Sequence, residues 1–439
     1  MSEKKTQIVV VGGGAGGLGL VSKLGARLGR DAFDVILLER NRTHIWKPLL
    51  HEVAAGSLDA NQDEVGYRAH CKRRKYRFFF GSLCDIDREN REAVIAPIVD
   101  EDGREIMGTH RIRYDYLVLA VGSVTNDFGT EGVRDHCLFL DSHREADRFR
   151  QKLLDHCLRV SRRMVLDPAA DEYVRVAIVG GGATGVELAA ELYNAAWALR
   201  HYGLEIFDES RLKVTLIEAG PRILPALPED LAEAAHLELE ALGVEVVTGA
   251  QVTRATSEAF EMGNGRRVEA DLLVWAAGVR GPDFLEGIGG LETTRANRLV
   301  VRPTLQTTRD PRIFAIGDCS HHVPEGEERP IPPRAQAAHQ MAETVFDNIL
   351  ALINGREPAR HFRYRDRGSL VSLSRFSTVG SLMGNLVGGR MAVEGRLARF
   401  VYVSLYRMHL LAIHGTVRGS GHIAVSKINN IVRPRLKLH

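Results

Sequence analysis

The chain is poor in cysteine and has no long apolar run. Its five cysteines (Cys71, Cys84, Cys137, Cys157 and Cys319) are odd in number and scattered, with no CxxC or CxxxxC pair. This pattern argues against a disulfide framework or a zinc site, so no metal is expected. No apolar stretch reaches the roughly 20 residues that cross a bilayer. The net charge of +2 gives no overall field that favours nucleic acid, so none is expected as a partner.

The chain is rich in glycine, with 43 residues, and two glycine motifs share one pattern. The apolar run 8–11 leads into Gly12, Gly14 and Gly17, and the run 176–179 leads into Gly180, Gly182 and Gly185. Each run predicts a buried parallel strand, and a helical pattern follows each motif. The glycines of such a motif allow a tight turn, close approach of a pyrophosphate and close helix packing. Each motif therefore predicts a dinucleotide site at a helix N-terminus.

The duplication extends beyond the glycines. Glu39 and Glu218 each end the next predicted strand, where an acid binds ribose hydroxyls; Glu218 comes late because residues 194–210 lengthen the connection. A later apolar strand ends in glycine in both copies, at Gly122 and Gly278. The sequence therefore predicts an α/β fold with two Rossmann-like dinucleotide-binding domains. Two dinucleotides in one chain indicate electron transfer between cofactors.

Three local motifs resemble a known family of flavoproteins. They are residues 46–54 (WKPLLHEVA), Ala335-Gln336-Ala-Ala-His-Gln340, and the C-terminal residues 404–409 and 432–439. The two fingerprints with the Ile316–Asp318 turn are similar to two-dinucleotide-binding-domain flavoproteins. Within these, the whole chain resembles the type II NADH:quinone dehydrogenases of the proteobacterial branch, which are single-subunit respiratory enzymes that do not pump protons.

The resemblance assigns a cofactor to each fingerprint. It implies tightly bound, non-covalent FAD at the first, with Asp318 on the ribityl or phosphate part and Lys47 near the flavin. It implies NADH as substrate at the second, where the Glu218 carboxylate would repel a 2′-phosphate. The full set of implied binding positions is Gly12, Gly14, Ala15, Gly17, Glu39, Lys47, Ala120, Gly122 and Asp318 for FAD, and Gly180, Gly182, Gly185, Glu218 and Gly278 for NADH.

The resemblance also implies three catalytic positions. Glu187, expected in the first turn after the second fingerprint, would lie near the nicotinamide and on a proton route; by itself it fits an acid favoured by the helix dipole. Gln336 and Gln340 have the i, i+4 spacing that places two side chains on one helix face. Uncharged amides can bind a quinone carbonyl without a buried charge.

The expected domains follow from these motifs. Residues 1–125 would begin the FAD-binding domain, 126–171 would connect, 172–290 would bind NADH, and 291–354 would return to the FAD-binding domain with the quinone-site helix. Residues 355–439 would form a C-terminal region that associates with the membrane.

The C-terminal region has its own charge balance. From Arg390 to His439 there are nine Lys or Arg and one acid, Glu394. Residues 399–414 are apolar and aromatic with interspersed cations, as suits a segment that lies in the membrane interface. Arg433, Arg435 and Lys437 could meet an anionic lipid surface. With no signal peptide in the sequence, we expect a peripheral protein on the cytoplasmic face of the inner membrane, with a homodimer possible.

Other functions stay open on the sequence alone. A sulfide:quinone oxidoreductase would share the fold, FAD and quinone but needs redox cysteines, for which only Cys157 and Cys319 are candidates. A soluble disulfide reductase is disfavoured because no CxxxxC follows the first domain. A non-enzymatic, NADH-sensing flavoprotein would keep both fingerprints without needing Gln336 and Gln340.

Overall fold

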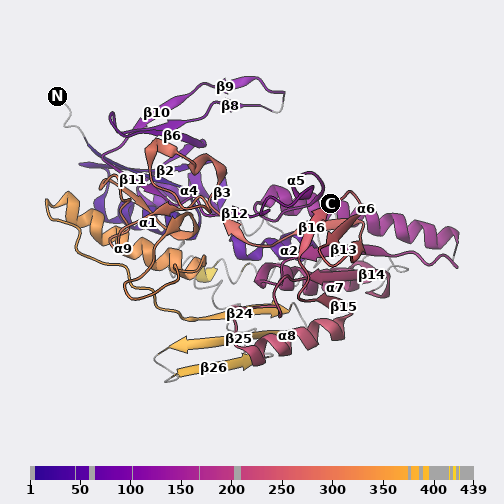
Figure 1. Cartoon of the computed structure of the whole chain (residues 1–439). Helices are drawn as coiled ribbons and strands as arrows, with labels where there is room; N and C mark the ends of the chain where they lie inside the picture. Colours follow the sequence, from indigo (N-terminus) through magenta and orange to yellow (C-terminus); the bar gives the residue numbers. More distant parts are fainter. Residues whose placement is uncertain are drawn as a thin grey trace.

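The computed structural model describes residues 5–44, 46–58, 65–100, 102–167, 169–201, 209–373, 377–384, 389–394, 415, 419–421 and 425. Two parallel sheets with flanking helices lie side by side, which confirms the predicted α/β fold (Figure 1). Among the described residues, no helix is long and apolar enough to cross a membrane. The segment 399–414 and the cations Arg433, Arg435 and Lys437 lie outside the described residues.

The first sheet has five parallel strands in the order β22-β11-β1-β2-β5. They are β1 (Thr6–Val11), β2 (Phe33–Glu39), β5 (Arg77–Phe80), β11 (Tyr116–Leu119) and β22 (Ile313–Ala315). In the central strand, the side chains of residues 8–10 have no exposed surface. A strand covered on both faces needs such a continuous apolar run, and the sequence supplies it.

Three helices lie beside this sheet: α1 (Ala15–Leu28), α4 (Tyr67–Arg74) and α9 (Ala335–Ile353). The apolar stripe Leu18, Val21 and Leu24 of α1 is fully buried. α1 also packs closely on α9, where a Cβ on Gly16 would lie 3.0 Å from the Ala338 carbonyl oxygen. An antiparallel layer adjoins the sheet, formed by β6 (Leu83–Asp87), β7 (Glu92–Ile95) and β10 (His110–Arg113), with the hairpin β8 (Ile98–Val99) and β9 (Glu105–Met107).

The second sheet has four parallel strands in the order β15-β14-β13-β19. They are β13 (Val174–Val179), β14 (Leu212–Ile217), β15 (Val244–Val247) and β19 (Leu272–Trp275). Helices α7 (Ala183–His201) and α8 (Glu229–Leu242) follow β13 and β14. A small antiparallel sheet of β16 (Val252–Ala255), β17 (Ala259–Met262) and β18 (Arg267–Glu269) adjoins it.

The chain leaves the first sheet after β11, builds the second sheet, and returns to the first as β22. Two short antiparallel strands, β12 (Val124–Thr125) and β20 (Val279–Arg280), join the outward and returning paths. Helix α6 (His143–Leu166) precedes the second sheet, close to the helix expected over residues 143–165, and α5 (Val133–His136) precedes α6. The two sheets are therefore linked by a paired ribbon.

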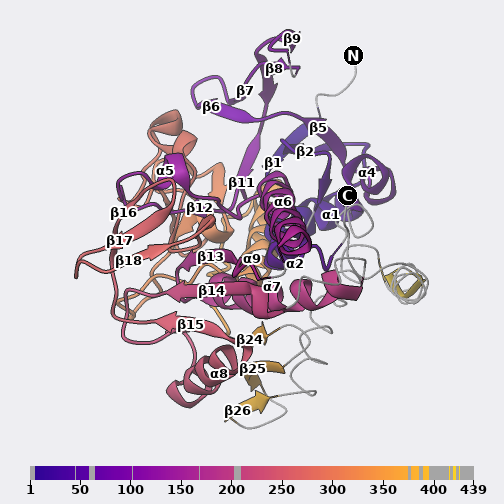
Figure 2. The same ribbon diagram turned by 90° about the vertical axis from the view of Figure 1, so that its right-hand side faces the viewer.

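A third sheet lies beside the helices of the second. It contains β24 (Gly368–Leu373), β25 (Ser377–Gly384) and β26 (Gly389–Glu394), where the sequence predicts strands over 369–374 and 378–383. β24 contacts α7, and both β24 and β25 contact α8 (Figure 2).

The remaining elements are short. They are α2 (Leu50–Ala55), η1 (Lys47–Leu49), η2 (Glu209–Arg211), η3 (Asp283–Leu285), η4 (Ile288–Gly290), η5 (Gly317–Cys319), β3 (Thr43–His44), β4 (Val65–Gly66), β21 (Leu299–Val300) and β23 (Ser320–His321).

Candidate functional site

The turn between β1 and α1 requires glycine at two positions. Gly12 has φ of +99°, and a Cβ there would lie 2.3 Å from the Ala120 carbonyl oxygen. A Cβ on Gly17 would lie 1.9 Å from the Gly12 carbonyl oxygen. A Cβ on Gly14, by contrast, would have no atom within 4 Å. The open space therefore lies at the N-terminus of α1, beside the carboxyl ends of the strands, where α/β sheets bind ligands.

Glu39 lies at the end of β2 and is 9% exposed. Its Oε2 accepts a hydrogen bond of 2.6 Å from the Gly13 amide, and Oε1 accepts from the amide and side chain of Asn41. The Gly13 carbonyl accepts a 2.8 Å hydrogen bond from the Tyr67 hydroxyl and lies 2.8 Å from Nδ1 of His44. These contacts hold the acid against the glycine turn, next to the open space.

The second fingerprint repeats this geometry. Gly180 has φ of +114°, and a Cβ on Gly185 would lie 2.0 Å from the Gly180 carbonyl oxygen. A Cβ on Gly182 would have no atom within 4 Å. Glu218, directly after β14, accepts hydrogen bonds of 2.6 Å from the Gly181 amide and 2.7 Å from the Gly220 amide. Each sheet therefore has the same cradle, which fits the pyrophosphate and ribose of a dinucleotide.

Lys47 and Asp318 come together at Ser123. The Lys47 ammonium donates to the Ser123 carbonyl oxygen at 3.0 Å and also lies 3.0 Å from Asp141. The Ser123 hydroxyl donates to Asp318 at 3.0 Å. Asp318 lies in η5, directly after Gly317 with φ of +73°. Ala120 and Gly122 lie in the chain between the end of β11 and Ser123. These predicted FAD-binding positions therefore lie together at one end of the first sheet.

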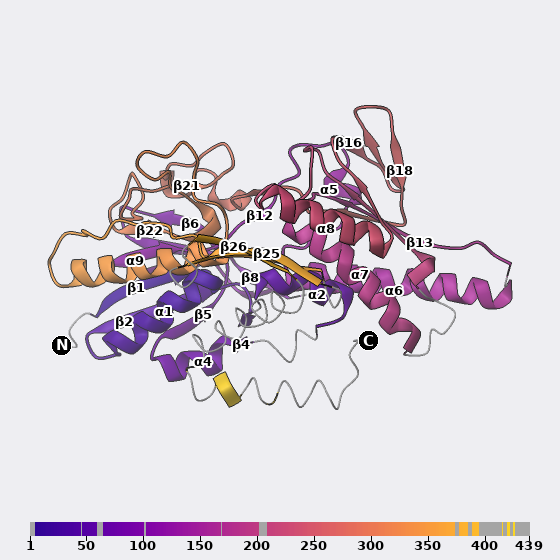
Figure 3. The same cartoon turned by 90° about the horizontal axis from the view of Figure 1, so that it is seen from below.

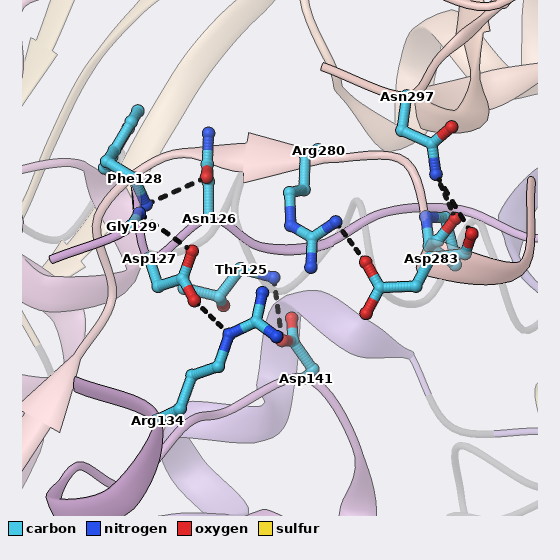
Figure 4. A network of polar contacts seen from close by, with 11 residues as sticks. Thr125, Asn126, Asp127, Phe128, Gly129, Arg134, Asp141, Arg280, Asp283 and Asn297 are labelled. Atoms are coloured by element: carbon cyan, nitrogen blue, oxygen red, sulfur yellow. Dashed lines mark hydrogen bonds and ion pairs between the residues drawn. The ribbon is translucent and has the colours of Figure 1, made fainter. Parts of the chain in front are cut away.

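The corresponding loop of the second sheet ends at Gly278, which has φ of +66°. A Cβ there would lie 2.4 Å from the ring of Phe128, which is 65% exposed and itself has φ of +52°. Polar contacts hold the ribbon beside it (Figure 4): Asp141 accepts from the Thr125 amide at 2.7 Å, and Arg280 pairs with Asp283. A bulky residue with positive φ is a local strain, and here it lies against a predicted NADH position.

Glu187 is the fifth residue of α7, which begins at Ala183, so the expectation of a first-turn acid is wrong. Its side chain is buried, and its Oε1 accepts a 3.1 Å hydrogen bond from the Ser372 amide of β24. His51 of α2 lies with Nδ1 3.5 Å from Glu187 Oε2 and Nε2 3.9 Å from Glu52 Oε1. Glu191, one turn after Glu187 on α7, is also buried and accepts a 2.7 Å hydrogen bond from the Asn194 side chain.

Burial sets the protonation of this cluster. It raises the pKa of Glu187 to about 8, and repulsion from Glu52 and Glu191 adds to the rise, while the Ser372 amide opposes it. Burial lowers the pKa of His51 to about 4, against the opposing effects of Glu191 and the Pro48 carbonyl. At pH 7 Glu187 is therefore protonated and His51 neutral, so their 3.5 Å contact is between neutral groups. A buried acid with a pKa near the working pH can exchange a proton.

Gln336 and Gln340 lie near the start of α9 and both bind the segment 365–368. The Gln336 amide donates to the Gly368 carbonyl at 2.9 Å and to Asp366 at 3.3 Å, and its oxygen accepts from the Arg367 amide at 3.0 Å. Gln340 donates to the Arg365 carbonyl and accepts from the Arg365 amide. This segment leads into β24, whose Ser372 binds Glu187. All three predicted catalytic side chains, from both halves of the molecule, therefore bind the backbone of one continuous segment, residues 365–372.

Comparisons with known proteins agree with this geometry. Residues 6–342 match the family model described as pyridine nucleotide-disulphide oxidoreductase. A type II NADH:quinone oxidoreductase of Haemophilus influenzae is 47% identical over 98% of this chain and 99% of its own length.

The chain belongs to the type II NADH:quinone oxidoreductases.

Solved structures share the fold of this type II NADH:quinone oxidoreductase. NDH2 of Plasmodium falciparum, solved in complex with NADH, has a TM-score of 0.81 at 20% identity and covers 99% of this chain and 100% of its own. A sulfide:quinone oxidoreductase of Aquifex aeolicus has a TM-score of 0.71 at 18% identity, covering 97% and 95%.

The cysteines separate this chain from sulfide chemistry. All five are free, and the two candidates lie in different cores: Cys157 packs with the second sheet and Cys319 with the first. Burial raises the pKa of Cys157 to about 12 and of Cys319 to about 11. Thiols need a thiolate to react, so neither side chain is suited to attack a sulfur substrate at neutral pH.

Sequence reasoning missed His51, Glu52 and Glu191 in the acid cluster and Ser123 beside Lys47. His51 and Glu52 lie within the motif 46–54 that carries the resemblance, so that motif is a signal which could have identified them. Ser123 follows Gly122 directly. Nothing local in the sequence indicates that residues 365–372 meet the glutamines and Glu187.

Proposed function

We propose that the chain oxidises NADH and passes the electrons through FAD to a membrane quinone without pumping protons. The observation that supports this most is the matched pair of cradles, each with open space at a helix N-terminus and an acid beside it. The full-length similarity to type II NADH:quinone oxidoreductases supports the electron donor and acceptor.

The first cradle would hold non-covalent FAD, and its residues fit that group. The α1 N-terminus would receive the pyrophosphate at Gly12, Gly14, Ala15 and Gly17, and Glu39 the ribose. Lys47 and Asp318, linked through Ser123 and next to Ala120 and Gly122, would hold the remaining polar parts of the cofactor. Bound FAD supplies the redox chemistry, accepting a hydride from the nicotinamide and giving two electrons to quinone.

The second cradle would hold NADH at Gly180, Gly182, Gly185 and Gly278. Glu218 would bind the adenosine ribose after releasing its present backbone partners, the Gly181 and Gly220 amides. A carboxylate at this position disfavours the 2′-phosphate of NADPH. Arg222, four residues after Glu218, is a cation that could bind a 2′-phosphate and soften this preference. It instead donates to the carbonyls of Leu224, Pro225 and Leu227.

Glu187 would supply or accept a proton near the nicotinamide and quinone. Its burial and its pKa of about 8 keep a proton available at neutral pH. His51, with one ring nitrogen toward Glu187 and the other toward Glu52, lies between a buried acid and one whose side chain is 26% exposed. The arrangement suits proton exchange with solvent.

Gln336 and Gln340 would form the quinone end of the site. Gln336 uses both amide hydrogens on the segment 365–368, whereas Gln340 uses one and keeps a second for a quinone carbonyl. Gln336 would then act as a positioning residue and Gln340 as the direct contact.

The finer assignments about domains and location are also proposals. We propose domain boundaries at 1–125, 126–171, 172–290, 291–354 and 355–439, and we propose that residues 355–439 associate with the membrane. The same holds for an anionic lipid surface as partner, a peripheral position on the cytoplasmic face of the inner membrane, and a possible homodimer.

The function is tested with the purified full chain. We expect a yellow protein whose flavin absorbance bleaches with NADH and returns with a short-chain quinone. Bleaching without return would exclude quinone reduction, and bleaching by sulfide would assign the rival chemistry. For the site, Gln336→Leu should slow reoxidation by quinone more than reduction by NADH, and equal slowing would show that Gln336 does not belong to the quinone end.

A further inference from the structure

Helix α4 and its C-terminal end carry an unusual run of positive charge. Residues 67–77 contain six Lys or Arg and no Asp or Glu. Arg68, Lys72, Arg73 and Lys75 are exposed. None of these four forms an ion pair within the part of the chain that the structure describes. A charge run of this density, with no acids in it, is typical of an interaction surface.

Helix α1 extends this surface. A Cβ on Gly25 would lie 2.2 Å from the Arg74 carbonyl oxygen, so the end of α4 rests on α1. α1 adds the exposed Arg27, and the Arg30 guanidinium beyond it donates to the Tyr76 carbonyl at 2.6 Å. We call the set Arg27, Arg30, Arg68, Lys72, Arg73, Arg74 and Lys75 the α4 patch.

Among the described residues, few acidic groups lie around the α4 patch. Asp34 is bound to Arg77 through two hydrogen bonds of 2.8 and 2.7 Å, and Glu343 is paired with Lys23. Asp31 is exposed. The patch therefore keeps a clear positive excess.

A cavity of about 500 Å³ lies at the edge of the patch, between α1 and α9. Lys23, Arg27 and Arg74 line it together with the apolar Ala342 and Phe346. Glu343 also lines it and is paired with Lys23, so Arg27 and Arg74 supply the positive excess there. Cations beside an apolar wall suit a molecule with an anionic head and a hydrocarbon part. Ala342 and Phe346 belong to α9, the helix that also carries Gln336 and Gln340.

One described residue of the C-terminal region lies beside the α4 patch. A Cβ on Gly415 would lie 3.9 Å from Nη2 of Arg74. Figure 3 shows α4 along the edge below α1, away from α6.

We propose that the α4 patch binds the headgroups of anionic phospholipids and forms a second membrane contact, on the folded body of the enzyme. The proposal rests on the proposed function in taking the bilayer as the source of quinone. One weak membrane signal gives only reversible binding, whereas two together anchor a protein stably. Contact through the α4 patch would bring the cavity and α9 to the membrane surface, so that quinone could reach the helix that bears the glutamines.

The test compares two full-length double variants with the parent protein. Lys72→Gln/Arg73→Gln removes two charges from the α4 patch. Lys152→Gln/Arg162→Gln removes two exposed charges from α6 and is the matched control. Binding is measured by flotation with vesicles of phosphatidylglycerol and phosphatidylcholine, and with phosphatidylcholine alone. Each headgroup contact contributes about fivefold, so the patch variant should bind anionic vesicles about twenty-five-fold more weakly, while the control binds like the parent.

Other outcomes overturn the proposal. Unchanged binding of the patch variant, or an equal loss in the control, would show that the α4 patch has no special role. If the patch variant bound RNA more weakly than the parent but bound vesicles equally well, the α4 patch would be assigned to nucleic acid. NADH oxidation with a short-chain, water-soluble quinone is measured in parallel without vesicles. If the parent oxidises NADH with this quinone and the patch variant binds vesicles like the parent, only the lipid-binding proposal is refuted. If the parent does not oxidise NADH, the proposed function is refuted.

Discussion

The two fingerprints share one geometry and differ at one position that carries chemistry. A Cβ on the last glycine would lie 1.9 Å from the carbonyl oxygen of the first glycine in one copy and 2.0 Å in the other. In both copies the acid accepts a 2.6 Å hydrogen bond from the amide of the residue after the first glycine. Two residues beyond the last glycine, the first copy has Gly19 and the second has Glu187. The cradle is therefore a shared scaffold, and the helix behind it has diverged.

Each of these positions faces a histidine from another part of the chain. A Cβ on Gly19 would lie 3.8 Å from Nδ1 of His339 on α9, whereas Glu187 contacts His51 on α2. In the first copy a small residue leaves room for α9 to approach α1. In the second copy a buried acid meets α2 and β24. The first copy therefore packs the fold together, and the second adds a titratable group.

The largest effect is expected from valine at the last glycine of either copy. Gly17→Val should yield protein without flavin and without activity, because the added carbons meet the Gly12 carbonyl oxygen. Gly185→Val should keep its flavin but lose about a hundredfold in NADH oxidation, since overpacking costs up to ~3 kcal/mol. Flavin absorbance per chain and NADH bleaching measure the two outcomes.

The matched controls use the open glycines. Gly14→Ala and Gly182→Ala place a methyl group where no atom lies within 4 Å. Both variants should fold like the parent. Gly14→Ala should weaken only the binding of FAD, and Gly182→Ala only the binding of NADH. Loss of flavin in Gly185→Val would contradict the assignment of a separate cofactor to each copy.

The next effect is expected at the diverged position. Glu187→Gln should slow quinone reduction about a hundredfold, because a positioned proton donor contributes at least that much, and should change flavin reduction by NADH only a few-fold. Stopped-flow measurement of each half-reaction separates the two. Gly19→Ala is the control, with an ordinary contact to His339 and no expected change. Equal slowing of both half-reactions by Glu187→Gln would mean that the acid supports structure and moves no proton.

A smaller effect distinguishes the two ribose acids. Glu218→Gln should lower the preference for NADH over NADPH about tenfold, equal to ~1.4 kcal/mol, because the charge that repels the 2′-phosphate is gone. Glu39→Gln should leave this preference unchanged and weaken FAD instead. The ratio of kcat/KM for the two nucleotides is the measurement. A shift of that ratio in Glu39→Gln would reverse the order of the cofactors.

The sequence predicts those parts of the molecule that depend on local pattern. Gly12, Gly180 and both acids follow from strand, turn and strand within one Rossmann unit. In the structure both glycines have positive φ, and each acid accepts a hydrogen bond from its glycine turn. The sequence places Glu187 in the wrong turn, because the start of α7 is set by where the glycine turn ends. The contacts of Glu187 with His51 and Ser372 join residues more than a hundred positions apart. Such pairings depend on how α2 and β24 pack against α7, which no local pattern encodes.

The last expected effect is on stability and not on activity, and it depends on pH. The pKa of Glu187 rises from 4.5 to about 8 on folding, so the folded state holds the proton more tightly. Its contribution to stability is complete below pH 4.5 and is lost as the pH rises through 8. Each pH unit between the two pKa values costs ~1.4 kcal/mol, and ~1 kcal/mol shifts Tm by about 2–4 °C in a domain of about 150–250 residues. Parent protein should therefore lose roughly ten degrees of Tm between pH 5 and 8 that Glu187→Gln keeps. His51, with its pKa lowered to about 4, acts in the opposite direction and costs stability as the pH falls below 6.5 in both proteins. Differential scanning calorimetry over pH 4–9 measures both slopes. Parallel profiles above pH 5 would show that Glu187 is ionised in the folded protein and cannot be the proton donor that sets the second fingerprint apart from the first.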